Sequence, residues 1–216
     1  MKQISQVIII FSLSVLLYGQ AAAQHSGPYA GAFIGGNALL NAKGADSVGN
    51  FGLSFDKALT GSAVLGWDFE PGNPAGEGRI ELEYSRRSNP LNRARFAEGS
   101  FKAGGSVTAD SLLVNFFGVH HDGSRFAPYI GAGVGVGRIE SASLTVTGAP
   151  LANDSAVVLA CQLGAGIDYA LTDYLNVDLG YRFFSSSKPT FTEVNGHTFA
   201  MNYVNHTAVI GLRVGF

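Results

Sequence analysis

The sequence predicts an all-β chain that forms a closed, antiparallel, eight-stranded up-and-down transmembrane β-barrel. Apolar residues recur at every second position in several segments, which is the period of an extended strand. Charged residues make up only 14% of the chain, and glycine is abundant with 29 residues. After residue 23, no apolar run approaches the roughly 20 residues that a membrane-spanning helix needs. A closed ring of strands fits these observations, because it pairs every backbone group inside a bilayer.

The first 23 residues are predicted to be a secretory signal peptide. Lys2 precedes an apolar run from Val7 to Leu17, which is too short to cross a membrane. Ala21 and Ala23 supply the small residues that favour cleavage. Cleavage is expected after Ala23, with cleavage after Ala21 as the alternative. Residues 24–216 would then form one barrel domain.

Eight segments carry the strand pattern, and in each of them one parity is more apolar than the other. In the fifth segment the second parity is nearly all glycine, so its facing is ambiguous; we place Ile130, Val134 and Val136 toward lipid. The single cysteine, Cys161, falls on an apolar parity and is expected to be a small apolar filler. The expected strands are residues 28–37, 61–69, 79–87, 106–119, 128–137, 157–169, 175–184 and 199–216.

The connectors alternate in length, which is typical of a barrel with short turns at one end and long loops at the other. Aromatic residues are expected to form belts at the two membrane surfaces. Trp67, Phe69, Tyr169 and Phe216 would lie at the turn end, and Tyr84, Tyr181 and Phe183 at the loop end. The expected short turns are residues 71–77, 121–125 and 172–173, and the expected long loops are residues 38–58, 88–105, 139–156 and 185–198.

The end of the chain resembles the C-terminal assembly signal of bacterial outer-membrane β-barrels. The matching positions are Gly211, Val214 and the terminal Phe216, whereas Val209 stands where that signal usually has a polar residue. The whole mature chain resembles the small eight-stranded outer-membrane barrel family that includes the OmpA transmembrane domain, OmpX and the Opa-type surface antigens. The segments that carry this resemblance are residues 79–84, 127–133, 164–169, 171–173 and 178–182.

The resemblance implies a location in the bacterial outer membrane and insertion by the barrel-assembly machinery, which would engage the last strand. It also implies a structural or surface-interaction role of the antigen or adhesin type, carried by extracellular loops and an extracellular partner. A small-solute or ion channel is the alternative, and a lipid A-modifying enzyme is a second one. The formal net charge of −2 gives no indication of nucleic-acid binding.

Charged residues on the inward parity are expected to pair across the barrel. An eight-stranded barrel leaves an interior that its own side chains just fill. We therefore predict a structural plug of ion pairs, with a narrow water-filled pore as the alternative. The predicted plug residues are Asp68, Arg79, Glu81, Glu83, Asp168, Asp178, Arg182 and Arg213.

A cluster of basic residues lies in and beside the second predicted long loop. At the outer leaflet, lipopolysaccharide phosphates would be natural partners, because arginine makes bidentate contacts with phosphate. A solvated loop without a ligand is the alternative. The predicted contact residues are Arg86, Arg87, Arg93, Arg95 and Lys102.

No catalytic, cofactor or metal site is predicted. The pair Glu81 and Glu83 has the residue types of a glycosidase, but a packed interior offers no sugar cleft. His206 is expected to be an interfacial residue. His120, His121 and Asp122 have metal-ligand types, but they lack a convincing third ligand and are interpreted as a solvated turn.

Overall fold

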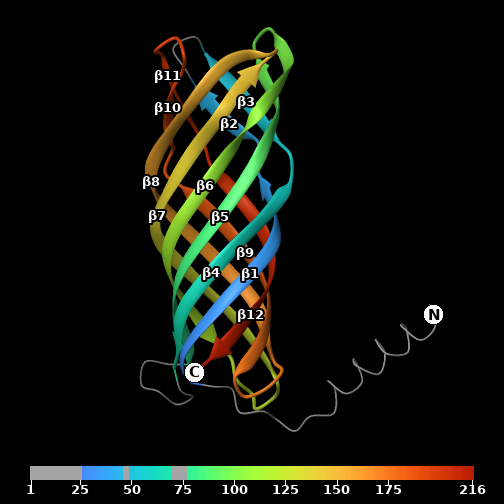
Figure 1. Ribbon diagram of the computed structural model, residues 1–216, viewed down its shortest axis with the longest axis vertical. Coiled ribbons are helices and arrows are strands. Elements are labelled where there is room, and N and C mark those ends of the chain that lie inside the picture. The colour runs from blue at the N-terminus through green and yellow to red at the C-terminus, as the bar shows by residue number, and fades with distance from the viewer. Residues whose placement is uncertain (1–25, 46–48, 70–76) are drawn as a thin grey trace, which may run out of the picture.

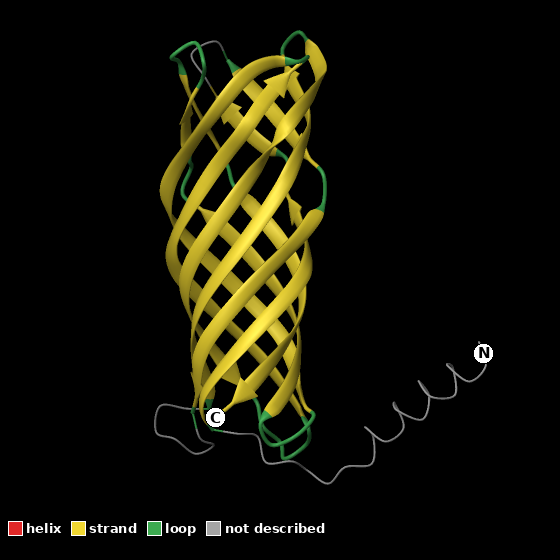
Figure 2. Cartoon of the chain, in the orientation of Figure 1, coloured by secondary structure: helices red, strands yellow, loops and turns green. Residues whose placement is uncertain are grey.

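The computed structural model describes residues 26–45, 49–69 and 77–216. These residues form a tall cylinder of tilted strands (Figures 1 and 2). The predicted signal peptide and nearly all of the predicted turn 71–77 lie outside the described residues. Within the described residues, no helix is long and apolar enough to cross a membrane.

Eight of the described strands close into one ring, which we call the lower barrel. Its closing seam joins the first and last strands, with Tyr29 opposite Gly215 and Leu39 opposite Asn205. Every pairing around the ring is antiparallel, so the predicted fold class is confirmed. In ring order the strands are β1 Gly27–Leu39, β4 Ala58–Asp68, β5 Gly78–Phe96, β6 Gly99–Val119, β7 Phe126–Val146, β8 Ala149–Ala170, β9 Leu175–Ser186 and β12 Val204–Gly215.

The outer face of the lower barrel is apolar, as a lipid-facing surface requires. Ile130, Val134 and Val136 expose 72%, 67% and 47% of their surface, which confirms the predicted lipid-facing side of the fifth strand. Cys161 is also exposed on this face. The same band contains Ile34, Leu65, Trp67, Leu82, Tyr84, Leu112, Phe116, Leu163, Ile167, Leu179, Tyr181, Ile210, Leu212 and Val214.

Strands continue through most of the predicted long loops 38–58, 88–105 and 139–156, so these three predictions are wrong. The predicted loop 185–198 gains one short strand at residues 190–192. β5 and β6 are joined only by residues 97–98, and β7 and β8 only by residues 147–148. Thr147 and Gly148 both have positive φ, which suits a tight hairpin turn. The single predicted final strand also divides in two. The added strands are β2 Ala42–Ala45, β3 Asn50–Phe55, β10 Thr190–Thr192 and β11 Thr198–Met201.

These added strands complete a second ring, which we call the upper barrel. It runs from the upper parts of β5, β6, β7 and β8 to β10, β11, β2 and β3, and then back to β5. The seam between β8 and β10 is held by the Val194 amide, which donates to the Leu151 carbonyl at 3.0 Å, and by the Thr192 amide, which donates to Asp154 Oδ2 at 2.8 Å. Figure 1 shows the four shared strands running through both barrels.

The interior of the upper barrel is apolar, whereas the interior of the lower barrel is polar and charged. The polar residues of the upper barrel face outward, which is the pattern of a β-barrel in water. Bulges between Pro90 and Arg93 and between Ser141 and Leu144 shift the inward-facing positions in β5 and β7. β6 keeps its inward parity through its own bulge between Gly104 and Ser106. The core contains Leu39, Leu53, Leu91, Ala94, Val107, Leu113, Ile139, Leu144, Val158, Phe184, Phe191, Phe199, Met201 and Tyr203.

We expect Phe191→Ala to loosen the upper barrel while the lower barrel stays closed. The Phe191 side chain is fully buried, and its ring centroid lies 5.5 Å from that of Phe199. Truncating a buried phenylalanine costs about 3–5 kcal/mol. Limited proteolysis in phospholipid nanodiscs should show faster cleavage in residues 185–203 with unchanged heat-modifiable gel mobility. The outward-facing Ile210→Ala variant is the control, and equal cleavage rates in the two variants would contradict this division.

Candidate functional site

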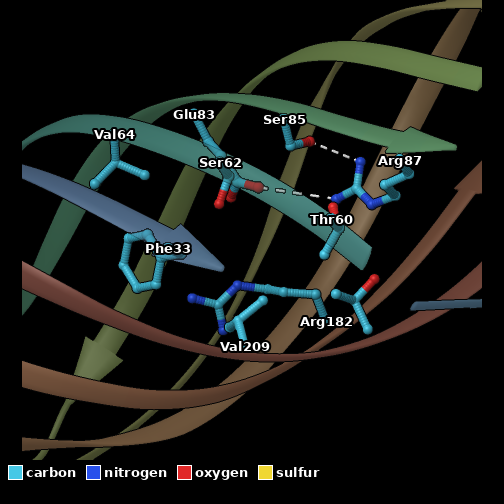
Figure 3. Close-up of a pocket in the computed structure, with 10 residues that line it drawn as sticks. Phe33, Thr60, Ser62, Val64, Glu83, Ser85, Arg87, Arg182 and Val209 are labelled. Carbon is cyan, nitrogen blue, oxygen red and sulfur yellow. Dashed lines mark hydrogen bonds and ion pairs between the residues drawn. The ribbon is translucent and has the colours of Figure 1, made fainter. Parts of the chain in front are cut away.

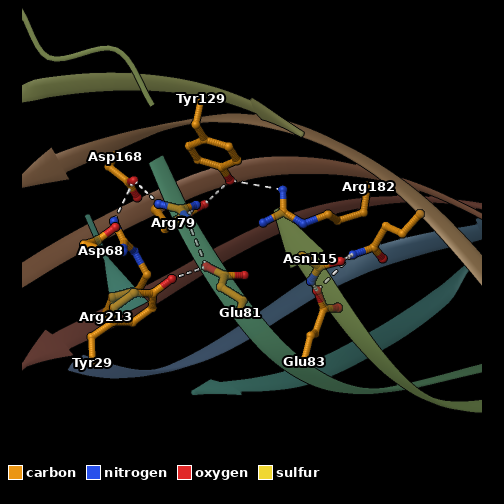
Figure 4. Close-up of polar contacts among 12 residues, drawn as sticks. Tyr29, Asp68, Arg79, Glu81, Glu83, Asn115, Tyr129, Asp168, Arg182 and Arg213 are labelled. Carbon is orange, nitrogen blue, oxygen red and sulfur yellow. Dashed lines mark hydrogen bonds and ion pairs between the residues drawn. The ribbon is translucent and has the colours of Figure 1, made fainter. Parts of the chain in front are cut away.

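The interior of the lower barrel holds a network of buried charges, with Arg79 at its centre (Figure 4). Arg79 is 1% exposed and contacts three carboxylates from three strands. Its Nε lies 3.0 Å from Glu81 Oε1 and its Nη2 lies 3.3 Å from Asp178 Oδ2, while its Nη1 pairs with Asp168. A buried guanidinium requires such partners, because desolvating an isolated charge is very costly.

Arg213, from the last strand, joins the network from the opposite wall. Its Nη2 lies 2.6 Å from Asp168 Oδ2 and its Nη1 lies 3.0 Å from Asp68 Oδ2. Asp168 therefore accepts from two arginines, one on β5 and one on β12. The Tyr29 ring lies 4.7 Å beneath the Arg213 guanidinium, and its hydroxyl donates to Glu81 Oε1 at 2.7 Å. The network thus ties strands on opposite sides of the ring together.

An aromatic pair separates Arg79 from Arg182. The rings of Phe117 and Tyr129 meet edge to face with centroids 5.2 Å apart. The Arg79 guanidinium lies 4.2 Å from the Tyr129 centroid, and that of Arg182 lies 5.0 Å from the Phe117 centroid. The Tyr129 hydroxyl accepts from Arg182 Nη1 at 3.1 Å and donates to Asp178 at 2.7 Å. Cation–π contacts of this kind strengthen when they are shielded from water.

A second polar layer lies above the first and is built around Glu83. Asn115 and Gln162 donate to Glu83 Oε2 at 2.8 and 2.9 Å. Arg87 lies 3.8 Å from Glu83 Oε1, donates to Gln162 at 3.0 Å, and stacks 4.5 Å from the Phe184 ring centroid. Arg87 is 2% exposed, so its predicted contact with lipopolysaccharide is wrong. Its alternation with Glu83 continues the inward parity of β5, which is the signal that could have placed it inside.

A small cavity remains beside this layer, against the wall formed by β1 and β4 (Figure 3). Its lining includes Phe33, Val64, Glu83, Arg87 and Arg182. Its volume is about 10 Å³, which is room for about one water molecule. The cavity therefore interrupts the packing locally, and above it the apolar core of the upper barrel begins.

Glycines at inward-facing positions make room for the side chains of the polar network. A Cβ at Gly133 would overlap the Asn115 amide, and one at Gly166 would overlap the Tyr129 hydroxyl. The glycine series on β7 therefore admits large neighbours into the barrel, as its strict strand parity indicated.

The other predicted basic residues lie on the outer surface at two heights. Arg86, at the upper edge of the apolar band, exposes 59% of its side chain, and its Nη1 lies 2.9 Å from Asp110 Oδ2. Asp110 also accepts from the Tyr84 hydroxyl at 2.8 Å and lies opposite Arg138 on β7. Arg93, Arg95 and Lys102 are exposed on the outer face of the upper barrel, where Arg93 lies directly opposite Lys102.

Two of the histidines contact neighbouring aromatic or acidic side chains. His206 hydrogen-bonds to the Tyr181 hydroxyl and packs against Phe183, with ring centroids 5.3 Å apart. His121 Nδ1 lies 3.3 Å from Glu77 Oε2. Across residues 26–45, 49–69 and 77–216, no group of three or more His, Cys, Asp or Glu residues is arranged to hold a metal ion.

All eight predicted plug residues lie inside the lower barrel and belong to the two layers. Sequence reasoning missed the neutral residues that hydrogen-bond to them, namely Tyr29, Asn115, Tyr129 and Gln162, together with Arg87. All of these lie on the inward parity of their strands, so extending the alternation to uncharged polar residues would have identified them.

The sequence matches the model of the outer membrane protein beta-barrel domain over residues 8–213. No curated protein matches it. Neisserial surface protein A has a similar structure, with 19% identity, a TM-score of 0.53, and coverage of 88% of this chain and 98% of that one. The outer membrane protein OprG from Pseudomonas aeruginosa is 11% identical, with a TM-score of 0.58 and coverage of 92% and 100%. The Escherichia coli outer membrane protease OmpT is 12% identical, with a TM-score of 0.48 and coverage of 87% and 97%.

We expect Arg79→Met to lower the free energy of unfolding by about 3–5 kcal/mol, because it strands buried carboxylates without their cation. Arg86→Met is the matched control. Its ion pair is exposed, so the change should cost less than about 1 kcal/mol. Urea unfolding in phospholipid vesicles, followed by tryptophan fluorescence, measures both. Equal losses in the two variants would refute the claim that the interior network stabilises the barrel.

Proposed function

Because the chain belongs to the outer membrane protein beta-barrel domain family, we propose that it is a non-conducting surface-interaction protein of the outer membrane. Its lower barrel would anchor it in the lipid, and its upper barrel would present a rigid surface to the outside. The predicted site of interaction therefore moves from flexible loops to the outer face of a sheet. Insertion through the C-terminal strand, with its Gly211, Val214 and Phe216, stays part of the proposal.

One observation carries this proposal: buried, mutually bonded polar side chains occupy the lower barrel in layers, and an apolar core occupies the upper barrel. Ion pairs centred on Arg79 fill the lower barrel, and Arg87 and Gln162 fill the layer above. Asn205 then links Asn37 and Asn89 at 3.0 and 3.2 Å, below the apolar core of the upper barrel. A conducting lumen would need a continuous polar path, and the apolar core does not supply one.

The enzyme alternative has less support. A lipid A-modifying site would need a nucleophile paired with a base at the lipid-facing surface. The histidine at the upper edge of the apolar band, His206, has Tyr181 and Phe183 as its neighbours. These contacts suit an aromatic residue at a membrane interface. We therefore propose that the protein is not an enzyme.

Lipopolysaccharide remains the proposed membrane partner, through Arg86 and Arg138 in place of the original five residues. These two arginines flank Asp110 in one cross-strand row at the upper edge of the apolar band. Arg86 is already oriented by Asp110, which leaves much of its guanidinium exposed. A phosphate at this height would add the counter-charge that a second arginine requires.

Purified protein is expected to be electrically silent in planar phospholipid bilayers. The cavity beside Glu83 and Arg87 has room for about one water molecule, which is too little for a hydrated ion. A general porin of known conductance serves as the positive control. Heat-modifiable mobility shows that the inserted protein is folded. Reproducible unitary steps from folded protein would overturn the proposal in favour of the channel.

The double variant Arg86→Gln/Arg138→Gln is expected to bind lipopolysaccharide about fivefold more weakly, since two exposed charge contacts contribute roughly 1 kcal/mol in total. Titration of nanodisc-embedded protein with lipopolysaccharide measures the affinity. Lys57→Gln/Arg125→Gln removes the same charge elsewhere and is the control. If both double variants bind as tightly as the unmodified protein, the contact is not at this row.

A further inference from the structure

Three cations line a shallow track across the outer face of the upper barrel. Arg95 on β5 and Lys43 on β2 border one concavity of about 700 Å³, with Gly52 on β3 between them. Lys43 and Lys188 border an adjoining concavity of about 220 Å³. We call Arg95, Lys43 and Lys188 the basic track. All three side chains are exposed, and no described acidic residue forms an ion pair with them.

The register of the strands sets the spacing of these cations. Lys43 lies opposite Gly52, and Gly52 lies opposite Arg95, so two strand spacings separate the two cations. Neighbouring strands are about 4.8 Å apart, which puts the two backbones about 10 Å from each other. Gly52 carries no side chain, and a Cβ there would meet no atom closer than 3.9 Å. Glycine is therefore not required by packing, and its absence of a side chain leaves an open slot between the two charges.

Amide side chains lie among the cations. Asn41 and Asn50 line the larger concavity, and Asn50 and Asn202 line the smaller one. The Asn202 backbone amide donates to the Lys43 carbonyl at 3.3 Å, which fixes the two chains side by side. Amides offer both donors and acceptors, which match the hydroxyl groups of a sugar. Regularly spaced cations match the anionic groups that recur along an acidic polysaccharide.

The basic track lies well above the membrane surface. Arg95 is nine residues beyond Arg86 on the same strand. At about 3.3 Å per residue and a tilt near 45°, this separation corresponds to a height of about 20 Å. Arg93 and Lys102, which face each other across β5 and β6 on this face, add further positive charge beside the track. Like charges placed directly opposite each other are destabilising unless a counter-charge is present.

From this arrangement we infer that the basic track is a binding site for an acidic polysaccharide that approaches from outside the cell. The inference rests on the proposed surface-interaction function and names its ligand class. Carboxylate or sulfate groups of the polysaccharide would contact Arg95, Lys43 and Lys188. The asparagine amides would contact the hydroxyl groups between them. The height above Arg86 separates this site from the row proposed for lipopolysaccharide phosphates.

The test measures binding of defined probes to the full chain in nanodiscs that lack lipopolysaccharide. The probes are dextran sulfate, hyaluronate and neutral dextran, and biolayer interferometry gives the dissociation constants. We expect dextran sulfate or hyaluronate to bind, with an affinity that falls as salt rises, and neutral dextran not to bind. The triple variant Lys43→Gln/Arg95→Gln/Lys188→Gln should bind at least tenfold more weakly.

The double variant Lys57→Gln/Arg125→Gln removes two charges away from the track and should bind like the unmodified protein. Lys43→Gln/Arg95→Gln, which removes two charges from the track, should bind more weakly. Equal weakening in these two double variants would reduce the effect to net charge and overturn the site. Failure of the unmodified protein to bind either acidic probe would also overturn it. Neither result alters the bilayer conductance, so the ligand assignment can fail while the non-conducting barrel stands.

Discussion

The pairing of β1 with β12 is the constraint on which the rest of the structure depends. Inside a bilayer no water satisfies backbone amides and carbonyls, so a strand edge cannot be left open. The seam from Tyr29 and Gly215 up to Leu39 and Asn205 removes that edge. Closure at eight strands then fixes an interior that is too narrow for solvent and must be filled by side chains. The buried charges are a consequence of this closure.

The charges inside the lower barrel are tolerated because they are nearly balanced and share partners. Asp168 accepts from both Arg79 and Arg213, and Asp178 contacts both Arg79 and the Tyr129 hydroxyl. Hydrophobic residues could fill the same space, since a buried ion pair is often no more stabilising than an apolar replacement. With an ionic interior, the two faces of each membrane strand differ in polarity: charged and polar side chains point inward, and apolar side chains point toward lipid. This arrangement distinguishes the inside of the barrel from its outside.

The sequence predicted the lower barrel well and the upper barrel poorly, for a physical reason. In the membrane, strands such as Arg79 to Tyr84 alternate strictly, because one face meets lipid and the other the polar interior. Above the membrane the polarity reverses, and the bulge between Pro90 and Arg93 shifts the phase at nearly the same height. Residues 86–90 are Arg, Arg, Ser, Asn and Pro, so neither parity is apolar there, and this run is typical of a loop. Arg87 belongs to this run, so the sequence predicted it among the basic residues in and beside the loop, although it keeps the inward parity of β5.

The basic track forms only when the upper barrel closes. Its cations come from β2, β5 and the segment before β10, which are distant in sequence and become neighbours only when the upper barrel closes. No motif in the sequence could have revealed it. What the sequence did show was an excess of basic residues around Arg93 and Arg95, without their relation to Lys43 and Lys188.

The four long strands shared by the two barrels have a mechanical consequence. β5 runs without interruption from Gly78 inside the lower barrel to Phe96 at its upper end, and β6 to β8 are of similar length. A pull on the top of these strands acts along their axes, across ladders of hydrogen bonds that lie perpendicular to the force. Such ladders are loaded in shear, so many bonds share the tension at once instead of opening one by one. A cell held by this surface would transmit traction directly into the membrane-embedded part of the protein.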